Sequence, residues 1–233
     1  MPTPTATSCH AVPTAAPAKG SPKLDLVGSP NGGKTSVFNQ LTGLHAKTGN
    51  YPGVTVSRST GVCRIGKDEY GIEDLPGAYS LTPISPDEAV VAEALDGSLE
   101  NVQAPDAVLV VTDATALRRS LLLLAETLER KLPTAVIVTM TDELRRRGGS
   151  LDITALSQAL GVPVVSVIAN RGIGIGELRH LISEWQTWSR PPVSPPTAAD
   201  ELAGWVDSVL TSAGYQDPQP DTRTAVSYTH LTL

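Results

Sequence analysis

A glycine-rich octapeptide at residues 28–35 places the strongest constraint on the fold of this chain. It reads Gly-Ser-Pro-Asn-Gly-Gly-Lys-Thr and fits G-x-x-x-x-G-K-[ST] at each fixed position. An apolar run at 24–27 precedes it, and a segment of helical spacing at 34–41 begins within it. In a strand-loop-helix unit of this kind, successive N–H groups and the helix N-terminus can surround a phosphate group. The sequence therefore predicts an α/β protein with a phosphate-binding loop (P-loop).

Short apolar runs alternate with segments of helical spacing along the rest of the chain. The predicted strands are residues 24–27, 55–65, 70–74, 107–113, 134–139 and 164–168, and the predicted helices are 34–41, 86–95, 117–131, 151–160, 176–188 and 200–213. This alternation is typical of a parallel sheet with crossover helices. We predict a P-loop NTPase fold, in which helices flank a mostly parallel six-stranded sheet to give a three-layer sandwich, followed by one short C-terminal helix.

Composition divides the chain into four parts. Residues 1–22 are rich in Pro, Thr and Ala and carry almost no charge, so we expect a disordered tail. Residues 23–189 form the predicted nucleotide-binding domain, and residues 190–226 form a Pro-rich linker with a single helix. Residues 227–233 do not continue the preceding pattern and are treated as a candidate non-native tail.

Net charge and hydropathy narrow the kinds of partner. The 233 residues include 18 Lys and Arg against 24 Asp and Glu, which gives a formal net charge of −6. No basic stripe favours nucleic acid. No apolar run approaches the roughly 20 residues that a membrane-spanning helix needs. We therefore expect a soluble chain without a nucleic-acid partner.

The residue types of two motifs point to a nucleotide with bound Mg²⁺. In the P-loop, Lys34 supplies a full positive charge to phosphate oxygens, and the hydroxyl of Thr35 is placed to bind Mg²⁺. Downstream, Asp74 and Gly77 form D-x-x-G at the end of a predicted strand. The carboxylate can hold the Mg²⁺ shell through water, and the N–H of Gly77 can meet a terminal phosphate.

A third segment, Gly-Asn-Tyr-Pro-Gly-Val-Thr at residues 49–55, lies between these two motifs. Thr55 on a flexible loop could complete the Mg²⁺ shell when a terminal phosphate is present. It could equally be a plain strand residue, because Thr is common in strands. The residues alone leave both interpretations open.

Three runs together resemble the G domain of the bacterial ferrous iron transport protein B (FeoB) family: GSPNGGKTSVFNQLTG at 28–43, GNYPGVTV at 49–56 and DLPGAYSL at 74–81. The resemblance covers about residues 23–188. It implies a GTPase that binds GTP or GDP with Mg²⁺ and couples its nucleotide state to Fe(II) uptake by a membrane transporter. It also implies a place at the cytoplasmic face of the bacterial inner membrane, the transporter's own membrane domain as partner, and a homo-oligomer as a further candidate assembly.

Position by position, the resemblance assigns roles to single residues. It makes Asn31, Lys34 and Gly77 catalytic, with Asn31 at the position that binds an activating K⁺ in potassium-dependent relatives. It makes Thr35, Thr55 and Asp74 the Mg²⁺ ligands. The nucleotide-binding residues that it implies are Asn31, Gly32, Gly33, Lys34, Thr35, Ser36, Asp74, Gly77, Thr139, Asp142, Ala169 and Asn170.

Both base-recognition motifs depart from the family pattern. The family's Asn-Met-x-Asp is Thr-Met-Thr-Asp at 139–142, so Asp142 can still accept hydrogen bonds from guanine, whereas the Asn contact is lost. The usual Ser-Ala-Lys or Ser-Thr-Arg is Ala-Asn-Arg at 169–171. The residue after D-x-x-G is Ala78, where many GTPases carry a water-orienting Gln, so we expect slow hydrolysis.

Two other functions are compatible with the same residues. A soluble GTPase of ribosome or RNA maturation would share the G-x-P-N-x-G-K-[ST] loop. A degenerate nucleotide-binding regulatory module would explain the altered base-recognition motifs through weak guanine selectivity.

Overall fold

The structure, a computed structural model, describes residues 17–188 and 195–220. Its sheet has seven strands in the order β2-β3-β4-β1-β5-β6-β7. The strands are β1 (Lys23–Gly28), β2 (Ala46–Asn50), β3 (Ser57–Ile65), β4 (Asp68–Asp74), β5 (Ala107–Asp113), β6 (Thr134–Thr139) and β7 (Val164–Ser166). The helices are α1 (Lys34–Thr42), α2 (Pro86–Asp96), α3 (Leu117–Leu128), α4 (Thr141–Arg146), α5 (Ile153–Leu160), α6 (Ile175–Ser183) and α7 (Ala199–Ser212).

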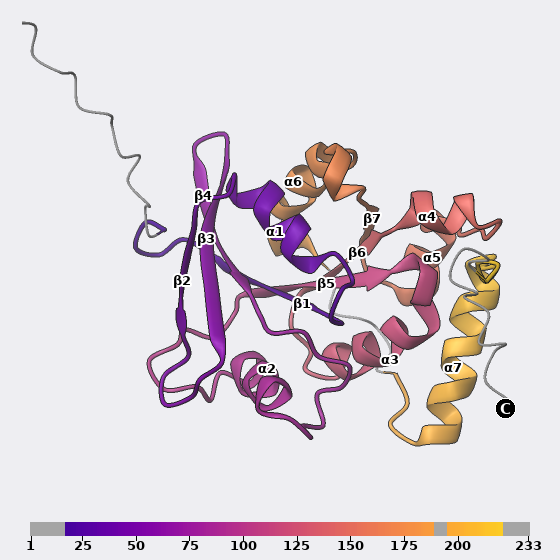
Figure 1. The fold of residues 1–233 in the computed structure, drawn as a ribbon, viewed down its shortest axis with the longest axis horizontal. Coiled ribbons are helices and arrows are strands. Elements are labelled where there is room, and N and C mark those ends of the chain that lie inside the picture. The colour runs from indigo at the N-terminus through magenta and orange to yellow at the C-terminus, as the bar shows by residue number, and fades with distance from the viewer. Residues whose placement is uncertain (1–16, 189–194, 221–233) are drawn as a thin grey trace, which may run out of the picture.

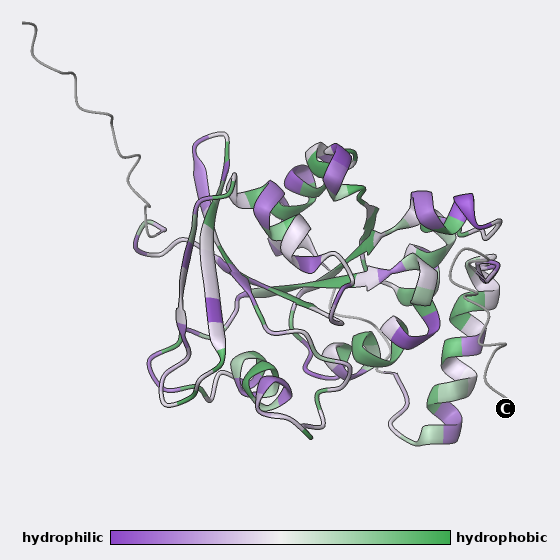
Figure 2. Ribbon diagram, viewed as in Figure 1, coloured by the Kyte–Doolittle hydropathy of each residue, from purple (hydrophilic) through white to green (hydrophobic). Residues whose placement is uncertain are grey.

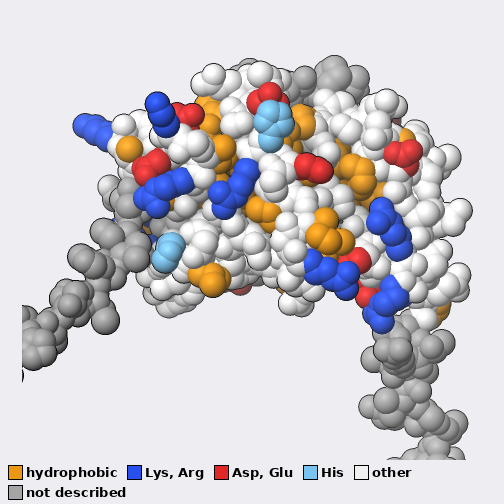
Figure 3. Space-filling view, turned by 90° about the horizontal axis from the view of Figure 1, so that it is seen from above, with side chains coloured by type: hydrophobic (Ala, Val, Ile, Leu, Met, Phe, Trp, Pro, Cys, Tyr) orange, Lys and Arg blue, Asp and Glu red, His pale blue; other side chains and the backbone are white. Residues whose placement is uncertain are grey.

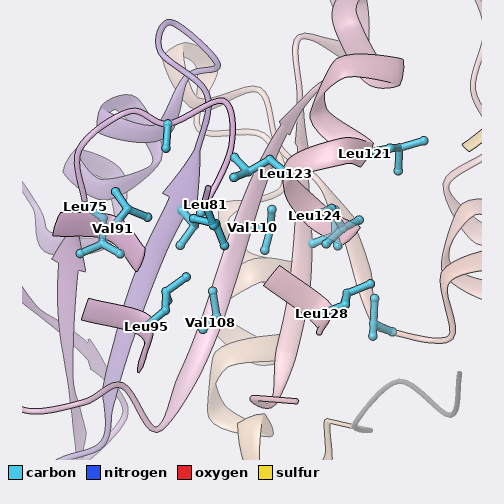
Figure 4. Close-up of a cluster of buried hydrophobic side chains, with 14 of the residues drawn as sticks. Leu75, Leu81, Val91, Leu95, Val108, Val110, Leu121, Leu123, Leu124 and Leu128 are labelled. Carbon is cyan, nitrogen blue, oxygen red and sulfur yellow. The ribbon is translucent and has the colours of Figure 1, made fainter. Parts of the chain in front are cut away.

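Helices cover both faces of the sheet, as predicted, and each face has its own apolar cluster (Figure 1). On one face, α1 and α6 pack their apolar sides on β1, β5 and β6. On the other face lie α2, α3 and α5. Figure 4 shows side chains of α2 and α3 meeting those of β5 and of the segment after β4. Apolar residues accordingly gather on the strands and on the inward sides of the helices (Figure 2). The face seen from above in Figure 3 mixes acidic, basic and apolar side chains.

The sheet contains one strand that the sequence did not predict. β2 pairs antiparallel with β3, and β3 pairs antiparallel with β4, whereas the pairs from β4 through β7 are parallel. The six-stranded prediction is therefore wrong by one edge strand. The β2 sequence, Ala-Lys-Thr-Gly-Asn, has no apolar alternation because the strand lies exposed at the edge, where burial sets no pattern.

Some element ends also differ from the predictions. β3 begins at Ser57, so Thr55 belongs to the β2–β3 connection and not to a strand. The short helix α4 follows β6 directly and was not predicted. α3 and α6 are shorter than expected, because α3 ends at Leu128 and α6 ends at Ser183.

The first described residues, 17–22, contact the main domain. Within the segment predicted as a disordered tail, residues 17–22 lie against β4: the main-chain N–H of Ala18 donates to Glu69, and the carbonyl of Pro22 accepts from Gly71. The rest of that segment lies outside the described residues, as do residues 189–194 and residues 221–233, which include the candidate non-native tail at 227–233.

The C-terminal helix α7 packs on the same chain. Val206, Val209 and Leu210 are buried in the cluster that α3 and α5 also line. The hydroxyl of Tyr215, just after the helix, donates to the carbonyl of Ala114 over 3.1 Å. In the part of the chain that the structure describes, no helix is long and apolar enough to cross a membrane.

Candidate functional site

The central residues of the P-loop, 29–33, lie between the end of β1 at Gly28 and the start of α1 at Lys34. Asn31 and Gly33 have left-handed backbones, with φ of 64° and 86°, which give the loop a tight turn. Backbone turns of this kind can present successive N–H groups to an anion. The loop borders a cleft of about 560 Å³. The cleft is lined by Ser29, Pro30, Asn31, Gly33, Lys34, Thr35, Ser36, Gly77, Asp87 and Met140.

The predicted lysine and the predicted Mg²⁺ ligands of the two motifs meet in one contact. Lys34 Nζ donates to Asp74 Oδ1 and to the carbonyl of Leu75. Thr35 Oγ1 donates to Asp74 Oδ2 over 3.0 Å. Lys34 and Asp74 are both buried. A hydroxyl and a carboxylate side by side are the hard oxygen donors that Mg²⁺ prefers, so the residues present fit the ion.

The D-x-x-G turn packs directly on the P-loop. A Cβ added to Gly77 would lie 2.8 Å from Pro30 Cγ, so no larger residue fits there without a shift of the loop. The N–H of the next residue, Ala78, donates to the carbonyl of Gly28 over 3.2 Å. Gly77 is thereby held at the edge of the cleft, beside the P-loop.

Two carboxylates that sequence reasoning missed fix the segment after this turn, residues 77–85. Glu126 of α3 accepts from Ser80 Oγ over 3.0 Å and from the N–H of Leu81. Glu88 of α2 accepts from the N–H groups of Tyr79 and Ile84 over 3.4 and 3.1 Å. No motif marks either glutamate, because each binds groups whose position only the folded chain defines.

Thr55 does not join Thr35 and Asp74. It is exposed in the β2–β3 connection and does not line the cleft at the P-loop. Figure 1 shows this connection at the lower left, well away from the loop between β1 and α1. The residue of this segment that is fixed is Tyr51, which is 1% exposed and donates its hydroxyl to Glu73 Oε1 over 2.7 Å.

A group of charges that the sequence did not single out lies around Glu73, and Glu73, Lys23 and Asp25 of this group are buried. Glu73 accepts from Arg58 Nε and Nη2 over 2.8 and 3.0 Å, and lies 3.0 Å from Lys23 Nζ. Burial alone would raise the pKa of Glu73, but the bonds from Arg58 and the charge of Lys23 outweigh it and lower that pKa. Burial also raises the pKa of the Tyr51 hydroxyl.

Asp25, on β1, is the least compensated member of this group. It is fully buried, and Lys23 Nζ lies 3.0 Å from Oδ1 but hydrogen-bonds Oδ2, which leaves Oδ1 without a hydrogen bond. Burial disfavours the carboxylate and raises the pKa of Asp25 from 3.8 to about 7, although the nearby Lys23 opposes the shift.

A second cavity, of about 430 Å³, adjoins the cleft and shares Gly33, Ser36 and Met140 with it. β6 and β7 are parallel neighbours, so the segments that follow them reach the same edge of the sheet. The cavity therefore brings together all four predicted base-recognition residues, namely Thr139, Asp142, Ala169 and Asn170. Its other lining residues are Glu143, Val167 and Ile168.

A larger hollow of about 800 Å³ lies between residues 18–22, 67–70 and 183–186, but it contains none of the predicted site residues. Among residues 17–188 and 195–220, no group of three His, Cys, Asp or Glu side chains is placed to hold a metal ion.

A P-loop between β1 and α1, a D-x-x-G turn on it and a base-side cavity after β6 and β7 define the G domain of a P-loop GTPase fold. The family model described as ferrous iron transport protein B matches residues 23–182. The chain therefore belongs to the FeoB family, in agreement with the resemblance seen in the sequence.

Individual relatives agree with this assignment. The Fe(2+) transporter FeoB of Leptospira biflexa is 42% identical over 165 residues, which cover 71% of this chain and 23% of that protein. A Porphyromonas gingivalis Fe(2+) transport protein A/FeoB fusion is 41% identical over 156 residues, which cover 67% of this chain and 18% of the fusion. The chain thus spans about a quarter or less of the length of these relatives.

Solved structures show the same fold. The G domain of T. maritima FeoB has a TM-score of 0.64 at 37% identity, covering 72% of this chain and 99% of that one. An S. thermophilus NFeoB mutant bound to GDP has a TM-score of 0.66 at 36% identity, covering 76% of this chain and 66% of that one.

The raised pKa of Asp25 predicts how stability depends on pH. The folded state keeps the proton up to about pH 7, whereas the unfolded state releases it near pH 3.8, so the contribution of Asp25 falls as pH rises between these values. We expect the free energy of unfolding of wild type minus that of Asp25→Asn to fall by roughly 1–4 kcal/mol from pH 4 to pH 7 and to stay constant above. Urea unfolding across this range measures the difference.

Asp68→Asn is the matched control, because Asp68 is an exposed aspartate on the neighbouring strand β4. The fall expected for Asp25→Asn should be absent from this variant. A constant difference for Asp25→Asn as well would show that Asp25 is ionised in the folded protein throughout.

Proposed function

We propose that this chain binds GTP or GDP with Mg²⁺ and hydrolyses GTP slowly, as the GTPase module of a ferrous iron transporter at the cytoplasmic face of the bacterial inner membrane. The observation that carries the proposal is that Lys34, Thr35 and Gly77 line one cleft, beside a cavity that holds Asp142. Asp74 binds both Lys34 and Thr35 there. A relative solved with GDP and the T. maritima cytosolic domain solved in a GMPPNP form support the choice of ligand.

The positively charged or N–H-donating groups and the oxygen-bearing side chains of the site have different roles. The P-loop N–H groups and Lys34 bind the phosphates and offset their negative charge. Thr35 and Asp74 would hold Mg²⁺, which supplies charge neutralisation at the terminal phosphates. The N–H of Gly77 would bind the terminal phosphate. Ala78 carries no group that could orient the attacking water, which favours slow hydrolysis.

Coupling to transport is part of the proposal. Residues 77–85 are fixed on α3 by Glu126, and α3 also packs against α7, the last described helix. A movement of Gly77 toward a terminal phosphate would therefore pull on α3 and reach the C-terminal side of the domain. The partner on that side would be the membrane domain of the same transporter.

A test of the proposal uses titration with labelled GDP, GTP and ATP in Mg²⁺ buffer. Wild type should prefer the guanine nucleotides, and Lys34→Ala should weaken their binding about 10- to 100-fold, because a charge-assisted contact is worth about 1.5–3 kcal/mol. Lys47→Ala, which removes an exposed lysine on β2, is the control and should bind like wild type. Equal affinity for guanine and adenine nucleotides would favour the degenerate regulatory module instead.

The contact between Lys34 and Asp74 predicts an unusual response to Mg²⁺. Without Mg²⁺, a phosphate must compete with Asp74 for Lys34, and the carboxylate that loses its partner is buried. We expect Asp74→Asn to bind GDP about three- to tenfold more tightly than wild type in EDTA, and to lose the gain that Mg²⁺ gives. Isothermal titration in EDTA and in Mg²⁺ measures both effects.

Asp87→Asn controls for the loss of a negative charge, because Asp87 lines the same cleft and is not a partner of Lys34 in its two hydrogen bonds. It should change GDP affinity in EDTA less than Asp74→Asn does. An equal rise in GDP affinity in both variants would mean that the effect comes from removing a negative charge near the cleft and not from the contact of Asp74 with Lys34.

Asn31 is proposed to hold K⁺ beside the phosphates, since its left-handed backbone places it on the rim of the cleft. A cation there would neutralise charge that develops during hydrolysis. Replacing K⁺ with Na⁺ should then slow GTP hydrolysis in wild type, measured as phosphate release, and should have little effect on Asn31→Ala. A wild-type rate that ignores the exchange would remove this role.

A further inference from the structure

Thr139 occupies the place where the family pattern puts a base-contacting Asn, but its side chain is committed elsewhere. It is the last residue of β6 and is 3% exposed. Its Oγ1 lies 2.7 Å from the carbonyl oxygen of Gly32 and 3.1 Å from that of Thr112. Both partners are acceptors, so the single hydroxyl hydrogen of Thr139 is shared between two main-chain carbonyls.

This commitment prevents Thr139 from reading the base. The O6 and N7 atoms of guanine accept hydrogen bonds and donate none. A residue that recognises this edge must supply a donor, as the amide of Asn would. The only hydrogen that Thr139 could offer points to Gly32 or Thr112, and the side chain has no other polar atom.

The same hydrogen bond orients the P-loop. Gly32 lies between Asn31 and Gly33, whose left-handed backbones give the loop its tight turn. A peptide unit is planar and trans, so its C=O and N–H point in opposite directions. Fixing the Gly32 carbonyl toward β6 therefore turns the N–H of Gly33 away from β6 and into the P-loop, where phosphate oxygens need donors.

Packing adds to this contact. A Cβ built on Gly33 would lie 3.4 Å from Thr139 Cγ2, so the threonine methyl lies against the glycine backbone. Thr139 thus contacts both residues of the peptide that joins Gly32 to Gly33: its hydroxyl binds the Gly32 carbonyl, and its methyl lies against Gly33. Residues 107 positions apart in the chain are tied at the point where the phosphate site and the base-side cavity meet.

We propose that Thr139 is a positioning residue of the phosphate site and not a base contact, and that Asp142 alone of the 139–142 segment selects the base. The proposal rests on the nucleotide-binding function argued above. It assigns the two halves of one motif to different parts of the ligand: the threonine to the phosphates through the P-loop, and the aspartate to the base.

The test compares Thr139→Val, which keeps the methyl group and replaces the hydroxyl with a second methyl, with Thr139→Ser, which keeps the hydroxyl and loses the methyl. Dissociation constants are measured for GDP, IDP and ADP, because GDP and IDP carry O6 and ADP does not. We expect Thr139→Val to weaken all three by the same factor, about three- to tenfold for one buried hydrogen bond, and Thr139→Ser to restore them. Asp142→Ala should instead weaken GDP most and ADP least.

A loss of GDP and IDP binding that spares ADP would mean that Thr139 contacts the base, and would overturn the proposal. So would a failure of Thr139→Ser to restore binding.

Amide hydrogen exchange of the nucleotide-free proteins separates this proposal from the proposed function. Thr139→Val should speed exchange in residues 28–35, whereas Thr139→Ser should match wild type. Unchanged exchange in Thr139→Val overturns the positioning role, whether or not nucleotides bind. Absence of guanine nucleotide binding by wild type, with faster exchange in Thr139→Val, would defeat the proposed function and leave the P-loop contact standing.

Discussion

The contact of Lys34 with Asp74 is the interaction on which the arrangement of the site depends. It joins the start of α1 to the end of β4, and it exists because β1 and β4 are parallel neighbours with Leu26 opposite Asp74. A buried lysine and a buried carboxylate stabilise the fold only when they are paired. This pair of charges therefore holds the P-loop and the D-x-x-G turn together. A phosphate that binds Lys34, or a Mg²⁺ ion that binds Asp74, would have to compete with the pairing.

β4 carries two carboxylates that act on opposite faces of the sheet. Successive residues of a strand point to opposite sides, so Asp74 faces Lys34 and Thr35 while Glu73 faces Arg58, Lys23 and Tyr51. The buried hydroxyl of Tyr51 holds the segment with Thr55 to the second face. For Thr55 to reach Mg²⁺, this segment would have to move, which is the kind of order change that small GTPases use as a switch.

Helix α3 contacts both the segment after Gly77, on the phosphate side of the domain, and the C-terminal helix α7. Its Glu126 holds the segment after Gly77, and Arg119 lies 4.0 Å from the ring centroid of Tyr79 in that segment. Its other side packs against α7, where Arg118 pairs with Asp207 at the surface. Exposed ion pairs contribute little, so the apolar contacts of Val206 and Leu210 hold α7 in place.

The sequence by itself determined the P-loop and most of the alternation of strands and helices, because these follow from local patterns of burial and from a motif within eight residues. The residues of the base-side cavity were indicated only by the family resemblance. Tertiary structure decided the rest. It added β2, which no burial pattern marks, and left Thr55 outside the cleft. It also turned Thr139 toward Gly32, and placed Glu73 and Glu126 against partners 15 or more residues away. Hydrogen bonds and ion pairs between distant segments leave no periodic signal in a sequence, so only the folded chain reveals them.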